Sequence, residues 1–273
     1  LPLLASDPAY NRHLSLMQPG YQVEGTVVID WDPNFHDRPR ILASPLAGGS
    51  GEYRVIGPFR ALSRAGLAQC DVVQMGKMFQ TRILMPTEIE RSKPDTLVLQ
   101  TAIDNAHLQA LASYKQHNPD VLRVFALDDL MTQVPRQNAY YRHSFRDAKP
   151  RMRKALALCD RAVVSTEPLA ELCRPMIEEV HVIPNRLERA LWGDLTSHRR
   201  QGAKPRVGWA GAQQHAGDLA LIEAVVKATA SEVDWVFFGM CPDTLRPYVR
   251  EFHDFVLSFY DYPAKLASLN LDL

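Results

Sequence analysis

The chain has 273 residues, 46% of them hydrophobic, and its 31 basic side chains equal its 31 acidic side chains in number. This balance leaves no overall field that would draw the protein to nucleic acid or to an anionic membrane, so we expect no nucleic-acid partner. No apolar run approaches the ~20 residues that a membrane-spanning helix needs, and the length suits a globular protein of two domains.

Residues 1–38 are rich in turn formers and only weakly periodic, and we interpret them as an N-terminal arm lying on the first domain. A short strand is predicted at residues 26–29, with Trp31 and Phe35 as anchors. The sequence begins without Met or the basic region of a signal peptide, so we expect it to be part of a larger multi-domain polypeptide. The scattered cysteines favour buried free thiols in a reducing compartment over disulfides; they are Cys70, Cys159, Cys173 and Cys241.

Residues 39–185 alternate short apolar runs with helical patterns, which is typical of an open parallel sheet. A helix is predicted with Val55, Ile56, Phe59 and Leu62 on one face, and another is capped by Asp104. The predicted strands cover residues 41–43, 71–73, 96–99, 121–127, 162–164 and 180–183.

A glycine-rich turn, Gly48 to Glu52, separates the first predicted strand from its helix. Such a turn lets a ligand approach both the backbone and the helix N-terminus closely. It is neither a dinucleotide-binding fingerprint nor a P-loop, because no Gly-Lys-Ser/Thr follows. A plain tight turn remains an equally open alternative.

Asp128 and Asp129 follow the fourth predicted strand. Ligands of open α/β sheets gather beyond the carboxyl ends of the strands, so these carboxylates are well placed for a site. Because adjacent side chains point in different directions, we do not expect the pair to share a proton. The open alternative is that one caps the next turn and the other is solvated.

Residues 186–203 are charged and aperiodic, as in a linker, and residues 204–273 restart the strand–turn–helix pattern as a second domain. Strands are predicted to begin at Arg206 and to cover residues 233–238 and 255–259, followed by a short helix at 263–268. Asp218 is predicted to cap a helix with Ile222, Val225 and Val226 on its inner face. The chain stops inside a further expected strand at residues 270–273.

Two α/β domains that each open on a glycine turn resemble the GT-B architecture of glycosyltransferases, which has two Rossmann-like domains. Residues 48–54 resemble the acceptor-side glycine turn, and residues 125–130 resemble the strand end of a bacterial subgroup. Residues 165–185 are similar to the exit from the N-terminal domain, and residues 208–218 to the start of the donor domain. Residues 6–16 are similar to a segment of large proteins that make cell-surface polysaccharide.

The nearest match is the retaining, family-4-like type of bacterial cell-surface polysaccharide and O-antigen synthesis. It implies transfer of a hexosyl or deoxyhexosyl group from a nucleotide-diphosphate sugar to a glycan or lipid-linked glycan acceptor, in the cytoplasm or at the inner face of the membrane. It also implies no metal and no cofactor, because helix N-termini and backbone amides hold the diphosphate.

The resemblance also implies roles for individual residues in a cleft between the two domains. Asp128 and Asp129 would be catalytic, either being the natural base if transfer inverts the anomeric centre. A solvated loop histidine is the open alternative for His215, and a helix cap is the favoured role for Asp218. The acceptor-binding residues would be Gly48, Gly49 and Ser50, and the donor-binding residues would be Gly211, Ala212, Gln213, His215 and Gly239.

Two departures from the family pattern are visible. Gln213, Gln214 and His215 stand where the family has an Arg and a Lys that neutralise the leaving diphosphate. The family's pair of glutamates would fall beyond Leu273, so we expect a truncated donor domain that turns over little by itself. A sugar-nucleotide epimerase of the same fold and a non-catalytic module of a larger synthase are the alternative functions.

Overall fold

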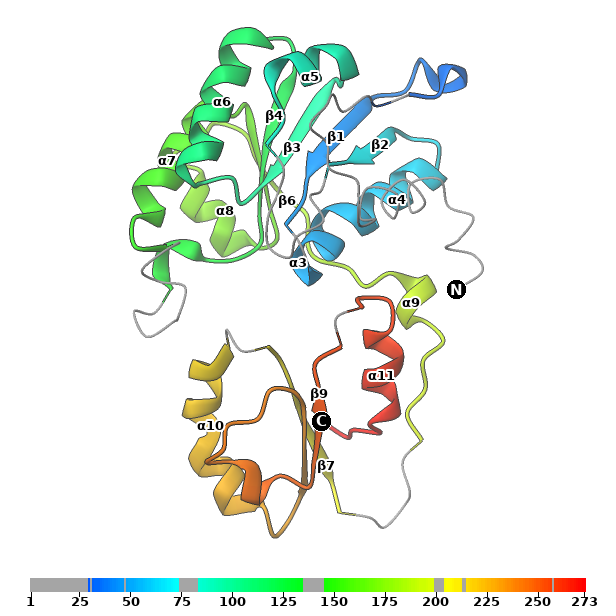
Figure 1. The fold of residues 1–273 in the computed structure, drawn as a ribbon, viewed down its shortest axis with the longest axis vertical. Helices are drawn as coiled ribbons and strands as arrows, with labels where there is room; N and C mark the ends of the chain where they lie inside the picture. Colours follow the sequence, from blue (N-terminus) through cyan, green and yellow to red (C-terminus); the bar gives the residue numbers. More distant parts are fainter. Residues whose placement is uncertain are drawn as a thin grey trace. The chain divides into compact units, whose positions relative to one another are not determined.

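The computed structural model describes residues 29, 31–46, 48–73, 83–134, 145–198, 204–212, 215–256 and 258–273 (Figure 1). Contacts divide them into two compact units. Unit 1 comprises the described residues up to Gln133 and those from 145 to Arg186, and unit 2 comprises Val134 and those from Leu187 onward. Each unit holds a parallel sheet with helices packed on it, which is the α/β, Rossmann-like class expected from the sequence.

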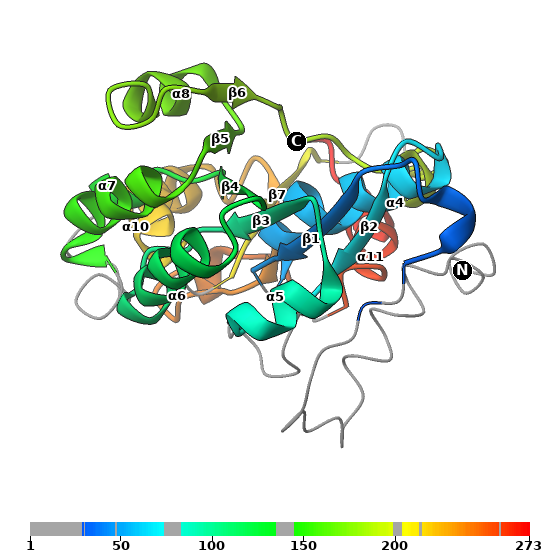
Figure 2. The same ribbon diagram turned by 90° about the horizontal axis from the view of Figure 1, so that it is seen from above.

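Unit 1 contains six parallel strands in the order β2-β1-β3-β4-β5-β6, a succession visible from above in Figure 2. The bounds are β1 Arg40–Ser44, β2 Gln69–Val72, β3 Thr96–Gln100, β4 Leu122–Leu127, β5 Arg161–Val164 and β6 Val180–Val182. All six strands predicted from apolar runs are confirmed. These runs are short and apolar because a parallel sheet is covered on both faces.

The helices of unit 1 divide between the two faces of the sheet. Phe59 of α4 shares a core with Ala43 and Val72, whereas Leu111 of α6 and Met152 of α7 share another with Leu97 and Phe125. The helices α5 and α8 also contribute to this second core. The bounds are α4 Gly57–Arg64, α5 Pro86–Ser92, α6 Asn105–His117, α7 Ala148–Leu158 and α8 Glu167–Cys173, with single turns η1 Pro33–Phe35 and η3 Met131–Gln133.

The chain after β1 is helical from α3 (Gly49–Gly51) through a π-helical segment, η2 (Glu52–Ile56), into α4. Val55, Ile56 and Phe59 are buried against the sheet, as predicted. A π-helical segment widens the turn, and such segments are frequent at functional sites. It bears here on the site because Ser50 and Arg54 lie on this stretch.

The end of the predicted arm is only partly anchored as expected, and the strand predicted at residues 26–29 lies almost wholly outside the described residues. The Trp31 indole packs on the core of unit 1 and donates a hydrogen bond to the Ser92 carbonyl. Phe35 was expected to anchor as well, but its side chain is 45% exposed, and only its carbonyl is used, by Gln69. The four cysteines are free thiols, three of them buried.

Unit 2 has three parallel strands in the order β7-β8-β9, with bounds β7 Arg206–Ala210, β8 Asp234–Gly239 and β9 Glu251–Asp254. The strand predicted at residues 255–259 is wrong, because β9 lies just before it. Phe252 pairs with Phe237 in the sheet, and Glu251 is held there by an ion pair with Arg206. An alternation of charged and apolar residues, rather than an apolar run, therefore marks this strand.

Helices cover both faces of the unit 2 sheet. Leu219 and Val226 of α10 (Ala216–Thr229) pack with Trp235 and Phe237, whereas α11 (Tyr262–Ser268) packs with Val236 and Phe238. The predicted inner face of α10 was partly wrong, since Val225 is 52% exposed. The buried face follows positions 219, 222 and 226, and Val225 lies to one side of it.

The last residues of the chain run beside β7. Gly208 N–H donates to the Leu273 carbonyl at 2.7 Å, and Asp272 N–H donates to the Arg206 carbonyl at 2.8 Å. Residues 270–273 thus lie along the edge of β7 opposite β8, but they do not form the expected strand. In the predicted linker, residues Arg189–Trp192 form α9, which packs on α11 with Trp192 6.4 Å from Tyr262 between ring centroids.

Candidate functional site

The strand order of unit 1 places a topological switch point between β1 and β3. The helical stretch after β1 covers one face of the sheet and α6, after β3, covers the other. Ligands of open α/β sheets bind at the carboxyl ends of the strands beside such a point. Ser44 pairs with Leu99 and Gln100 pairs with Ala126, so the residues that follow β1, β3 and β4 meet at this edge.

A chain of hydrogen bonds joins three of these elements. Gln100 Nε2 donates to Ser50 Oγ at 2.6 Å, and Ser50 Oγ donates to Asp128 Oδ2 at 2.5 Å. Gln100 Oε1 accepts a hydrogen bond from Leu46 N–H at 2.9 Å. Ser50 and Asp128, predicted as site residues from separate stretches of the sequence, are therefore in direct contact.

Gln100 was missed by the sequence analysis, although it is only 2% exposed. A buried glutamine must satisfy both ends of its amide, and this one does so within the cluster. The available signal was a polar residue that ends an otherwise apolar strand. That signal becomes specific only once the strand order shows that β3 borders the switch point.

The two adjacent aspartates have different surroundings, as expected. The Asp128 carboxylate points to Ser50, and its backbone carbonyl accepts a hydrogen bond from Ser165 Oγ at 3.1 Å. Asp129 is exposed, and its carbonyl accepts from Met131 N–H at the start of η3. Of the two acids, only Asp128 belongs to the cluster with Ser50 and Gln100.

Arg54 brings a half-buried positive charge to the same edge. Its guanidinium donates to the Ile183 carbonyl and to Asn185 Oδ1, at 3.1 Å to the latter, which ties η2 to the chain leaving β6. Burial lowers the pKa of Arg54, and the negative charge of Asp128 opposes that lowering. Among the described residues, its buried Nε atom has no acceptor.

Glycine is suited to each position of the turn for a different physical reason. Gly48 adopts a φ of 91°, which disfavours any residue with a side chain. A Cβ on Gly51 would lie 1.9 Å from the Leu46 carbonyl oxygen, so Gly51 is needed for close packing. A Cβ on Gly49 would meet only the Tyr53 ring, at 3.7 Å. Gly49 therefore leaves the backbone approachable.

Beyond β3 the edge carries a strained residue and an acid–histidine pair. Thr101 has a φ of 56°, an outlier for a β-branched residue. Asp104 caps α6, as predicted, and its carboxylate also contacts His107 Nδ1 at 2.7 Å. The hydrogen bond with His107 is the main cause that lowers the pKa of Asp104.

In unit 2, the structure brings Gly211 and Gly239 together at the carboxyl ends of β7 and β8. Gly211 N–H donates to the Phe238 carbonyl at 3.0 Å, and a Cβ on Gly239 would lie 2.4 Å from the Gly211 carbonyl oxygen. Gly239 has a φ of 101°. The two predicted donor-side glycines thus allow the two backbones to pack closely at this edge, with Ala212 following directly.

The other predicted donor-side residues have mixed outcomes. His215 occupies the N-cap position of α10, and its Nδ1 lies 2.9 Å from Asp218 Oδ2. Asp218 was expected to cap the helix but lies in its first turn, because the helix already begins at Ala216. A carboxylate there still complements the helix dipole. Gln213 and Gln214 lie outside the described residues.

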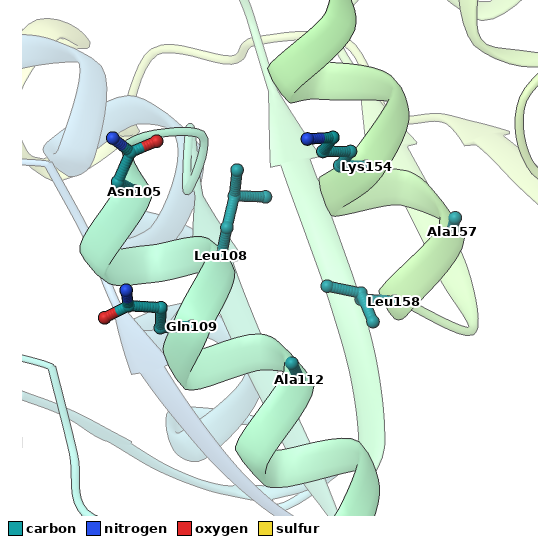
Figure 3. Close-up of a pocket in the computed structure, with 7 residues that line it drawn as sticks. All are labelled: Asn105, Leu108, Gln109, Ala112, Lys154, Ala157 and Leu158. Carbon is teal, nitrogen blue, oxygen red and sulfur yellow. The ribbon is translucent and has the colours of Figure 1, made fainter.

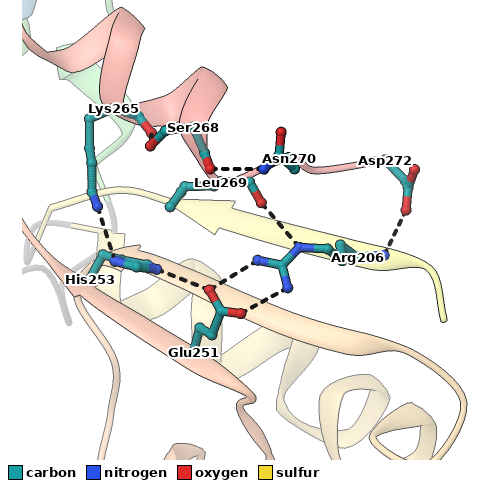
Figure 4. Close-up of polar contacts among 8 residues, drawn as sticks. All are labelled: Arg206, Glu251, His253, Lys265, Ser268, Leu269, Asn270 and Asp272. Carbon is teal, nitrogen blue, oxygen red and sulfur yellow. Dashed lines mark hydrogen bonds and ion pairs between the residues drawn. The ribbon is translucent and has the colours of Figure 1, made fainter. Parts of the chain in front are cut away.

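A second polar network in unit 2 lies at the amino ends of β7 and β9 (Figure 4). Arg206 makes a bidentate pair with Glu251, at 2.9 and 3.0 Å, and donates from Nε to the Leu269 carbonyl. His253 is part-buried between Glu251 and Lys265. The Arg206 hydrogen bonds lower the pKa of Glu251 to about 2. Because the network lies at the amino ends of the strands, and ligands of open α/β sheets bind at the carboxyl ends, we interpret the network as structural.

A groove between α6 and α7 is lined by Leu108, Gln109, Lys154 and neighbouring residues (Figure 3). It lies between two helices that pack on the same core, and its lining does not include Ser50, Gln100 or Asp128. In the described part of the chain, no cluster of His, Cys, Asp or Glu side chains could hold a metal ion. Nor does any described helix have the length and apolar character needed to cross a membrane.

Comparison with known proteins adds no relative to these observations. The sequence matches no protein-family model, and it matches no curated protein.

Proposed function

We propose that the protein is a glycosyltransferase of GT-B type that transfers a sugar from a nucleotide-diphosphate donor to a glycan acceptor. The observation that carries the proposal is the Gln100–Ser50–Asp128 cluster, which lies at the switch point of one α/β unit beside a glycine turn. A second α/β unit in the same chain brings two glycines together at its own strand ends. The resemblance described from the sequence supplies the reaction.

In this proposal unit 1 holds the acceptor. A carboxylate such as Asp128 accepts hydrogen bonds from sugar hydroxyls, and one already bonded to Ser50 is held in place to do so. If transfer inverts the anomeric centre, Asp128 is the base for the attacking hydroxyl, whereas retention requires only that it orient the acceptor.

Unit 2 would hold the donor. The paired glycines mark the carboxyl ends of β7 and β8, where a nucleotide would bind, and the start of α10 would offer the N–H groups of its first turn to a diphosphate. His215 would donate a hydrogen bond to the phosphates from Nε2 when its imidazole carries both protons, because its Nδ1 proton is directed to Asp218. The donor half thus uses backbone amides and needs no metal ion.

The test is transfer of radiolabelled sugar by the full-length protein from UDP-glucose, UDP-galactose, GDP-mannose and dTDP-rhamnose to a mixture of oligosaccharide acceptors. We expect one donor to be used, with Asp128→Asn lowering transfer on the order of tenfold or more. If none of the donors is bound or used, the transferase proposal fails and a non-catalytic module is the better description.

An epimerase is favoured by one observation, the Asp104–His107 pair at the same edge as Asp128. An epimerase breaks a C–H bond of the sugar and would exchange deuterium from solvent D2O into the recovered nucleotide sugar. A transferase leaves those positions unlabelled. Mass spectrometry of the donor after incubation in D2O therefore separates the two functions.

A further inference from the structure

We infer that Gln100 is a positioning residue that acts by way of Ser50 and fixes Asp128 as an acceptor of hydrogen bonds from a ligand hydroxyl. This inference rests on the proposed function, and it names the chemistry that the acceptor must present. The argument follows the direction of each hydrogen bond in the cluster.

The direction is set at Leu46, whose backbone N–H can only donate. It therefore meets the oxygen of the Gln100 amide, 2.9 Å away, and the amide nitrogen must face Ser50. Because Gln100 Nε2 can only donate, Ser50 Oγ accepts from it. The single proton of Ser50 is then left to donate to Asp128 Oδ2, 2.5 Å away.

Asp128 consequently accepts a hydrogen bond from inside the protein, and this bond occupies its Oδ2 atom. An ionised carboxylate only accepts hydrogen bonds. Among the described residues, none makes a hydrogen bond to Asp128 Oδ1, since the Ser50 hydroxyl bonds to Oδ2. The ligand group that meets Oδ1 must therefore donate, as a sugar hydroxyl does. A phosphate group, which is negatively charged and accepts, is repelled by the same carboxylate.

The positioning is rigid because each member belongs to a different element. Gln100 is 2% exposed at the end of β3, and Ser50 lies in the first turn of the helix after β1. Asp128 follows β4 and is also held through its carbonyl by Ser165. Loss of the Gln100 amide frees the Ser50 hydroxyl to rotate, and Asp128 then loses its fixed orientation.

The experiment compares Gln100→Leu with Gln69→Leu. Gln69 is a matched control, because it also lies on a strand of this sheet and its side-chain amide also makes two hydrogen bonds, with Asp32 N–H and the Phe35 carbonyl. It begins β2 at the opposite end of the sheet. Ser50→Ala is a second, smaller change that interrupts the same chain and keeps a helix-compatible side chain.

The first readout needs no activity. The Ser50 hydroxyl proton is expected as a slowly exchanging resonance in proton NMR of the full chain, assigned by its loss in Ser50→Ala. We expect Gln100→Leu to abolish it and Gln69→Leu to retain it. Persistence of the resonance in Gln100→Leu, with the fold intact by circular dichroism, overturns the inference whatever the protein transfers.

The second readout uses the sugar donor that the wild-type protein accepts. Gln100→Leu is expected to lower kcat on the order of tenfold and to leave KM for the nucleotide sugar unchanged, because the donor meets unit 2. Gln69→Leu is expected to leave both unchanged. An unchanged kcat in Gln100→Leu contradicts the inference, whereas absence of any donor turnover by the wild type contradicts the proposed function alone.

Discussion

At the scale of single residues, strain is concentrated beside the cluster. Thr101 follows Gln100 directly and adopts a left-handed conformation that costs a β-branched residue about 1 kcal/mol or more. Its N–H donates to the Ala126 carbonyl, so β4 holds it in place. Strain of this kind is typical of sites in which backbone position matters more than stability.

Relief of this strain gives the first prediction. Asparagine adopts the left-handed region more readily than threonine, so Thr101→Asn is expected to raise the free energy of unfolding by about 0.5–1 kcal/mol. Urea denaturation measures the change. Thr96→Asn is the matched control at the start of the same strand, where the backbone is extended, and it is expected to lower stability. Equal effects at the two positions would show that Thr101 is not strained.

A second prediction concerns the packing of Gly51. A Cβ there would overlap the Leu46 carbonyl oxygen, which belongs to the backbone and moves only with the turn. We expect Gly51→Ala to destabilise the protein by at least about 2 kcal/mol. Gly49→Ala, two positions earlier, meets only the Tyr53 ring and should change stability by less than about 1 kcal/mol. Comparable losses would contradict this distinction.

At the scale of elements, the Arg206–Glu251 pair connects the amino ends of β7 and β9 across β8 (Figure 4). The pKa of Glu251 is lowered from its ordinary value to about 2 by hydrogen bonds from Arg206. A lowered folded-state pKa means that the unfolded chain binds the proton first as pH falls. The contribution to stability is therefore present above about pH 4.5 and is lost between there and about pH 2.

The third prediction follows from this loss of stability at low pH. The melting temperature of the protein should fall between about pH 4.5 and 2, and Glu251→Gln should make that fall shallower while lowering the melting temperature at pH 7. Near-ultraviolet circular dichroism reports on Trp209 and Trp235 in this unit. Glu232→Gln, an exposed acid after α10, is the control and should leave the wild-type profile unchanged. A Glu251→Gln profile that matches the wild type would refute the assignment.

The elements also show what sequence patterns can and cannot predict. The strands of unit 1 were predictable because buried parallel strands leave unbroken apolar runs between turn signals. The strand β9 was not, because two of its four residues, Glu251 and His253, form a polar network with Arg206 and Lys265. That network depends on contacts between positions far apart in the sequence, so local periodicity does not reveal it.

At the scale of the whole molecule, single residues of the candidate site were predictable from the sequence, but the contacts between them were not. Ser50 and Asp128 were each predicted from a glycine turn or a strand end, but their contact follows from the order β2-β1-β3-β4. The same order gives Gln100 its role, which no local pattern indicates. Gly211 and Gly239 likewise meet only because β7 and β8 are neighbours.

The fourth prediction follows from the proposal that unit 1 holds the acceptor and unit 2 holds the donor, and it tests that proposal most directly. Nitrogen-15 NMR of the full chain, titrated with UDP, GDP and dTDP, reports on each backbone amide separately. The account predicts that one of these nucleotides shifts the amides of Gly211, Ala212 and Gly239 and leaves those of Ser50 and Gln100 unchanged. If none of the three nucleotides shifts the unit 2 amides, or if the shifts fall only on unit 1, the account is contradicted.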